Sequence, residues 1–128
     1  MSAIAIQRSN TILYCRHWQQ TVAFYREGFG LRPTFDTDWF VELQVAPASF
    51  LSLADEARAS IASAEGKGIT LSWQVNDLRS THETLRRAGL EPGPIRAHSW
   101  GAWICHLWDP EGHRIELWMP RAARVPEA

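Results

Sequence analysis

Tryptophan is the residue type whose abundance most directly suggests chemistry in this chain. Seven tryptophans occur in 128 residues, several times the ordinary usage. Each combines a flat ring, which stacks on other rings or binds cations, with an N–H group that needs a hydrogen-bond partner. A core of this size accommodates about two or three such side chains. We therefore expect others to line a ligand cavity or a subunit interface.

His106 and Glu116 are the residues with the clearest capacity for acid–base chemistry. Glu116 could pair with Arg114 or a water molecule. Alternatively, it accepts a hydrogen bond from a cationic or N–H-bearing ligand, or acts as a general base. His106 either bonds to a neighbouring strand residue, or binds a ligand, or transfers a proton. We take both as candidate catalytic residues. The sequence shows no nucleophile constellation, phosphate loop or dinucleotide fingerprint.

Composition excludes several classes of function. The net charge is −1 and no basic stripe is present, so we expect no nucleic-acid partner. No apolar run approaches the roughly 20 residues that span a membrane, and the N-terminus lacks the pattern of a secretory signal. Cys15 and Cys105 lie in apolar runs typical of strands, which favours free buried thiols over a disulfide or metal site. A cytoplasmic protein fits these features.

A repeated pattern indicates how these residues are positioned. Gly30–Pro33 and Gly89–Pro92 share the order Gly-Leu-X-Pro, and each follows a helix-like stretch. Leu51–Leu53 recurs further along the chain as Ile115–Leu117, and Trp39 with Leu43 recurs at the same spacing as Trp103 with Leu107. Such internal repetition predicts two similar halves. We expect the ligand to bind in the cleft that they share.

Each half reads as strand, helix and three further strands. Asn76 or Asp77 is expected to cap the start of the second helix, and the glycines that follow each helix mark where it ends. We place a first module at about residues 9–54, a linker with some helix at about 55–68, a second module at about 69–120 and a loose tail at 121–128. Expected helices cover 19–28 and 77–87; expected strands or extended segments cover 9–18, 33–35, 39–45, 49–53, 69–75, 92–96, 100–108 and 114–119.

Several motifs resemble the vicinal oxygen chelate superfamily, which includes glyoxalase, bleomycin-resistance proteins, extradiol dioxygenases and fosfomycin-resistance enzymes. The motifs are Phe24-Tyr25 late in the first helix, Gly30-Leu31 after it, and the turn Asp109–His113 before Ile115–Leu117. The resemblance extends from about Ser9 to Pro120. It implies an α+β fold, with two βαβββ modules in tandem that form paired curved mixed sheets around a cleft and carry helices outside.

The resemblance also implies where a metal would bind. Metal-dependent members place ligands in the first and last strands of each half, which here correspond to Asn10, Ser52, Thr70 and Glu116. Only Glu116 is a good charged ligand, and an amide with two hydroxyls completes a poor site for zinc, iron or manganese. We therefore expect no cofactor, and a divalent metal held through Glu116 is the alternative.

Strand alternation extends the candidate site, because residues two apart in a strand share a face. In similar dioxygenases a tyrosine that acts on the substrate occupies the position of His106. The other histidines, His17, His82, His98 and His113, lie in caps, a helix or turns, where we expect surface positions. The candidate ligand-binding residues are Asn10, Tyr14, Trp39, Ser52, Thr70, Ser72, Gln74, Trp100, Trp103, His106 and Trp118.

These observations favour a homodimeric binding protein of the bleomycin-resistance type. It would sequester an aromatic ligand or antibiotic in a tryptophan-rich cleft without metal, and so act in antibiotic resistance. One alternative is a metal-dependent glyoxalase- or dioxygenase-type enzyme with an unusual ligand set. Another is a metal-free lyase or isomerase that uses Glu116 or His106.

Overall fold

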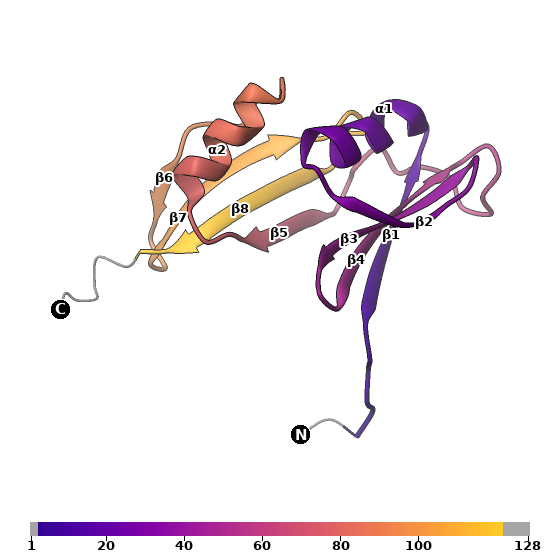
Figure 1. Cartoon of the computed structure of the whole chain (residues 1–128), viewed down its shortest axis with the longest axis horizontal. Coiled ribbons are helices and arrows are strands. Elements are labelled where there is room, and N and C mark those ends of the chain that lie inside the picture. Colours follow the sequence, from indigo (N-terminus) through magenta and orange to yellow (C-terminus); the bar gives the residue numbers. More distant parts are fainter. Residues whose placement is uncertain (1–2, 122–128) are drawn as a thin grey trace. The chain divides into compact units, whose positions relative to one another are not determined.

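The computed structural model describes residues 3–121, which form two compact units divided between Glu65 and Gly66. Each unit has the order strand, helix and three strands, and holds one four-stranded mixed sheet (Figure 1). The predicted α+β fold with two βαβββ modules is therefore confirmed. No helix in the described part of the chain is long and apolar enough to cross a membrane.

The first unit places β1 and β4 side by side in parallel, with sheet order β1-β4-β3-β2 and antiparallel pairing elsewhere. Helix α1 contacts β1 and β4, and the Trp18 indole donates to the Leu53 carbonyl oxygen at 2.8 Å. The elements are β1 (Ser9–Cys15), α1 (Trp18–Ala23), the π-helix η1 (Phe24–Gly28), β2 (Arg32–Asp36), β3 (Phe40–Ala46) and β4 (Ser49–Asp55).

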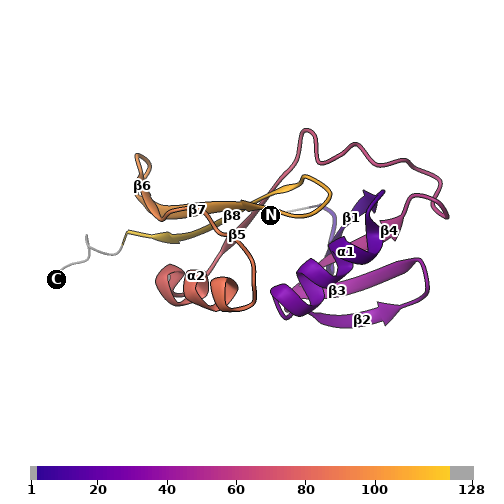
Figure 2. The ribbon, with the colours of Figure 1, turned by 90° about the horizontal axis from the view of Figure 1, so that it is seen from above.

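The second unit repeats this plan, with sheet order β5-β8-β7-β6 and parallel pairing of β5 with β8. Asp77 caps α2 by accepting from the backbone N–H groups of Arg79 and Ser80, as the sequence predicts. Figure 2 shows α2 along one face of its sheet. The elements are β5 (Thr70–Gln74), α2 (Leu78–Arg87), β6 (Arg96–His98), β7 (Ala102–Trp108) and β8 (Arg114–Pro120).

Alternation along the strands separates a core face from a second face in each sheet. In β8, Ile115 and Leu117 are buried, whereas Glu116 and Trp118 retain partial exposure. On the core face, buried residues pair across neighbouring strands, as Leu43 does with Leu51 and Leu71 with Ile115. We call the opposite side, which carries Glu116, the helix-free face. The core residues include Leu13, Cys15, Val41, Leu43, Leu51, Leu53, Leu71, Leu78, Leu85, Cys105, Leu107, Ile115 and Leu117.

The segment between β4 and β5 contains turns and no helix, so the helix expected there is wrong. Side chains bond to nearby backbone instead: Asp55 accepts from the Ala57 N–H at 3.0 Å, and Glu56 accepts from the Ser63 N–H at 2.9 Å. Such local bonds compete with the helical pattern. The expected extended segment at 92–96 also differs, because β6 begins only at Arg96.

The turn between β7 and β8 is held by a buried Asp–His pair. His113 Nδ1 donates to Asp109 Oδ2 at 2.9 Å, and both side chains are almost fully buried. Asp109 Oδ1 also accepts from the backbone N–H groups of Glu111 and His113, each at 2.9 Å. The expectation that His113 lies on the surface is therefore wrong, because its ring completes the bonding of a buried carboxylate.

Cys15 and Cys105 are both buried and form no disulfide, as the sequence predicts. Burial raises the pKa of the Cys105 thiol to about 11. Because the thiolate is the reactive form of cysteine, Cys105 is a packing residue at neutral pH.

Candidate functional site

Glu116 is the centre of a hydrogen-bonded trio on the helix-free face of the second unit. It lies on β8, directly opposite His106 on β7 and Ser72 on β5. His106 Nε2 lies 3.2 Å from Glu116 Oε1, and the Ser72 hydroxyl donates to Oε2 at 2.9 Å. Both carboxylate oxygens therefore have partners. The two candidate catalytic residues are brought together, as strand alternation indicates.

Opposing effects set the acidity of Glu116. Burial raises its pKa, but hydrogen bonds with Ser72 and His106, together with the electrostatic influence of His106 and Arg114, bring the pKa below its usual value. Arg114 donates through Nε to the Thr70 hydroxyl at 3.1 Å, which keeps a guanidinium beside the trio. The Glu116 side chain is therefore a carboxylate at neutral pH. It can pair with a cation or accept a hydrogen bond from an N–H donor.

This lowered pKa predicts a pH dependence of stability. A carboxyl group with a lowered folded-state pKa stabilises the fold above its unfolded pKa, about 4.3, and the contribution is lost as pH falls through the folded value. We therefore expect the destabilisation caused by Glu116→Gln to shrink between about pH 5 and pH 3. Urea unfolding of both proteins at several pH values measures this difference in stability. A pH-independent difference would contradict the assignment, and Glu83→Gln on α2 is the exposed control.

Tryptophan side chains share the face of the sheet that carries this trio. Trp118 follows Glu116 by two residues and meets Trp100 edge-to-face, with ring centroids 5.3 Å apart. Trp108 lies 6.4 Å from the His106 ring and, with Trp100, is more than half exposed. A hollow of about 430 Å³ lies beside His106, within the size range of small-molecule sites. Its lining residues are Gly93, Pro94, Arg96, Ala97, His98, Ile104, Cys105, His106 and Trp108.

The equivalent place in the first unit holds a closed polar cluster. The Ser52 hydroxyl donates to Asn10 Oδ1 at 2.8 Å, and Asn10 Nδ2 donates to Glu42 Oε2 at 3.3 Å. The Thr34 hydroxyl and the Arg8 guanidinium contact Glu42 Oε1 at 2.8 and 3.1 Å. The predicted pair Asn10 and Ser52 therefore meets, and the carboxylate that joins them is Glu42.

Glu42 is the site residue that the sequence interpretation missed. It lies opposite Ser52 in the register of β3 and β4, as His106 lies opposite Glu116 in β7 and β8. The signal was present, because the spacing from Glu42 to His106 equals the spacing from Ser52 to Glu116. Extending the repeat by one strand identifies it.

Tyr14 and Trp39 line a separate hollow of about 310 Å³ in the first unit, together with Ile12, Phe40 and Arg58. The Arg58 guanidinium carbon lies 5.9 Å from the Trp39 ring centroid. This hollow has an aromatic and cationic lining, distinct in composition from the Asn10 cluster. Gln74, another predicted binding residue, is exposed on β5 opposite Trp118.

Trp103 does not join the other predicted site residues of its unit. It is three residues from His106 in β7, and an odd separation places the two side chains on opposite faces of the sheet. It lines instead a hollow beside α2 with Leu78 and Met119. Grouping Trp103 with His106 and Glu116 is therefore wrong.

The side chains at the positions expected to bind a metal are a poor match for zinc, iron or manganese. No group of three or more His, Cys, Asp or Glu side chains that could hold a metal ion occurs between residues 3 and 121. His106 and Glu116 are the strong donors in the second unit, and Ser72 supplies only a hydroxyl. At the first-unit positions, Asn10 and Ser52 are already bonded to each other.

Solved structures share this fold across nearly the whole chain. A glyoxalase/bleomycin resistance protein/dioxygenase from Nocardioides has a TM-score of 0.74 at 17% identity, covering 94% of this chain and 86% of its own. TnmS3, an antibiotic binding protein from Streptomyces sp. CB03234, has a TM-score of 0.74 at 18% identity, with 94% and 99% covered. Lactoylglutathione lyase from Agrobacterium tumefaciens has a TM-score of 0.70 at 19% identity, covering 91% of this chain and 94% of its own.

The search of curated proteins gives no match. The family comparison is decisive, because a single family model matches residues 7–117, most of the chain and both units. The duplicated βαβββ order and the Asp109–His113 turn fall within this range. The chain therefore belongs to the Glyoxalase/Bleomycin resistance protein/Dioxygenase superfamily.

Proposed function

We propose that the protein binds a small aromatic molecule, such as an antibiotic, on the helix-free face of its second unit and acts by sequestering it. The observation that carries this proposal is the Glu116 carboxylate, held by Ser72 and His106, beside the Trp100–Trp118 pair. Sequestration needs a preformed site of suitable chemistry and no reacting group. The fold shared with TnmS3, described as an antibiotic binding protein, supports the same reading.

The chemistry of the site defines the ligand class. A flat ring would stack against the exposed faces of Trp100 or Trp108, while a cationic or N–H group would donate to Glu116. His106 can donate or accept, according to which ring nitrogen carries the proton. The ligand is thus an aromatic compound with at least one nitrogen-borne hydrogen. We also propose that the protein acts as a homodimer in the cytoplasm.

A screen of planar and glycopeptide antibiotics by tryptophan fluorescence tests this function. We expect at least one to quench or shift the emission at tens of micromolar. Glu116→Gln should weaken binding of that compound about tenfold, since a neutral amide replaces a charged acceptor. Glu83→Gln, on the surface of α2, should leave the affinity unchanged. Absence of any spectral change across the screen would overturn the proposal.

A second candidate function is metal-free acid–base catalysis, favoured by the 3.2 Å contact between His106 and Glu116. Such a pair can take a proton from a carbon next to a carbonyl and return it elsewhere. The discriminating variant is again Glu116→Gln, which in an enzyme would abolish turnover and retain substrate binding. Elemental analysis before and after chelation addresses a metal-dependent enzyme. Stoichiometric metal that only a chelator removes would favour that alternative over sequestration.

A further inference from the structure

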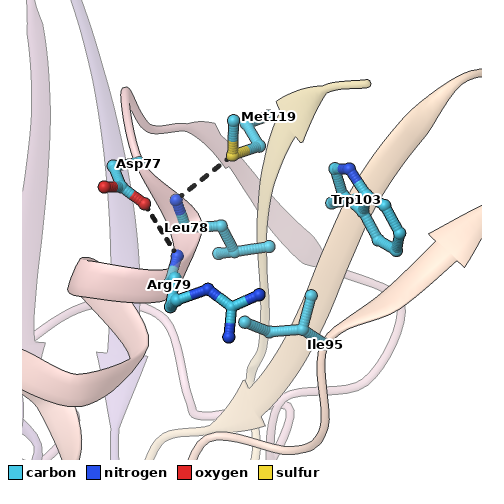
Figure 3. A pocket seen from close by; sticks show the side chains of 6 residues that line it. All are labelled: Asp77, Leu78, Arg79, Ile95, Trp103 and Met119. Carbon is cyan, nitrogen blue, oxygen red and sulfur yellow. Dashed lines mark hydrogen bonds between the residues drawn. The ribbon is translucent and has the colours of Figure 1, made fainter. Parts of the chain in front are cut away.

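The second unit has another hollow, on the opposite side of its sheet from Glu116. It has a volume of about 420 Å³ and is lined by Asp77, Leu78, Arg79, Ile95, Trp103 and Met119 (Figure 3). We call it the helix pocket, because α2 begins beside it. Its volume falls within the range of small-molecule sites, roughly 300–1,000 Å³. The pocket is built entirely within one unit, so it is complete in the chain itself.

The wall of the helix pocket is apolar and aromatic. Leu78 is buried, and Ile95 and Met119 are partly exposed. Trp103 is 37% exposed, although it belongs to a strand face whose neighbours Cys105 and Leu107 are fully buried. Covering its remaining surface with a flat apolar group would be favourable, at roughly 25 cal/mol per Å². The pocket therefore offers a stacking surface that the protein's own side chains leave partly uncovered.

The charges around the helix pocket favour an anion. Arg79 lines it and, among the described residues, forms no ion pair with a carboxylate. The Arg121 guanidinium carbon lies 5.1 Å from the Trp103 ring centroid. Asp77 is the acidic residue that lines the pocket. Its Oδ1 already accepts hydrogen bonds from two backbone N–H groups of α2. Figure 3 shows the Arg79 side chain extending beside Ile95.

We propose that the helix pocket is a second ligand site, which binds a small aromatic monoanion such as an aryl carboxylate. The ring packs against Trp103 and Met119, and the carboxylate takes hydrogen bonds from the Arg79 guanidinium, whose planar donors match a carboxylate. This ligand class is the inverse of the one proposed for the helix-free face, where a carboxylate of the protein is the acceptor. The two sites are therefore distinguishable by ligand charge.

Titration with 2-naphthoate, followed by calorimetry and by NMR of the tryptophan indole N–H signals, tests this site. The Trp103 signal is assigned as the one lost in Trp103→Phe. We expect 2-naphthoate to shift that signal, and Arg79→Gln to weaken binding about tenfold. The neutral analogue 2-naphthylmethanol should bind about tenfold more weakly than 2-naphthoate. Arg87→Gln, further along the same helix and paired with Glu83, should leave the affinity unchanged.

Three results would overturn the proposal. One is the absence of any shift in the Trp103 signal at millimolar 2-naphthoate. Another is a shift confined to the signals of Trp100 or Trp118, which would place the anion on the helix-free face. The third is binding that disappears as protein concentration rises, which would show that a second copy of the chain covers Trp103. Failure of the antibiotic screen leaves each of these readouts intact.

Discussion

Replacing Gly66 by alanine is expected to lower the free energy of unfolding by roughly 2 to 5 kcal/mol. Gly66 has φ +80°, a conformation that costs a side-chain-bearing residue free energy. A Cβ there would also overlap the Gly112 carbonyl group and lie 2.5 Å from the His113 nitrogen. These are backbone atoms of the β7–β8 turn, which cannot move aside as a flexible side chain can. Urea unfolding monitored by circular dichroism measures the loss.

Gly68 provides the matched control for Gly66. It has nearly the same φ, +79°, but a Cβ at this position would meet nothing within 4 Å. Gly68→Ala should therefore show only the conformational cost, about 1 to 2 kcal/mol. Equal effects of the two substitutions would show that the close approach to Gly112 contributes nothing.

Asp109→Ala is expected to destabilise the protein by roughly 3 to 5 kcal/mol. The substitution removes the acceptor of two backbone N–H groups and of His113 Nδ1, all in a buried turn. Buried donors without partners are costly because water no longer satisfies them. Thermal and urea unfolding measure the effect, and the near-ultraviolet circular dichroism of the tryptophans reports whether the packing around the turn persists.

Two companion substitutions separate the contributions at Asp109. Asp109→Asn keeps an oxygen acceptor and removes the charge, so it should cost less than alanine. Asp77→Ala removes the exposed cap of α2 and should cost about 1 kcal/mol. A loss at Asp109 no larger than that at Asp77 would contradict the role assigned to the buried pair.

The order of elements could be predicted because strand alternation and helix punctuation are local properties. Asp77 caps α2, and Gly89 follows the helix with φ +90°. Both features could be predicted from the residue types alone. The grouping of Ser72, His106 and Glu116 also follows from alternation once the strands are aligned on the repeat. Trp103, also a candidate ligand-binding residue, lies on the opposite face from His106, because an odd number of positions separates the two residues in β7.

Other features depend on contacts that no local pattern records. The burial of His113 follows from a carboxylate four residues away, and the backbone of Gly66 approaches the same turn from a distant part of the chain. The Ala- and Ser-rich stretch before Gly66 suggested helix by composition, yet Asp55 and Glu56 bond to its backbone and stabilise turns. Tertiary packing and side-chain-to-backbone bonds decided both cases.

The π-helix η1 accounts for a one-residue difference in length between the two helical segments. Trp18 and Leu78 are the first residues of α1 and α2, and their separation exceeds that of Gly30 and Gly89 by a single position. The first helical segment is thus longer by that position, and the Phe29 N–H bonds to the Phe24 carbonyl five residues back. A π turn accommodates such an inserted residue as a local bulge. The duplicated halves could therefore diverge in length at their helices while their strands kept a common register.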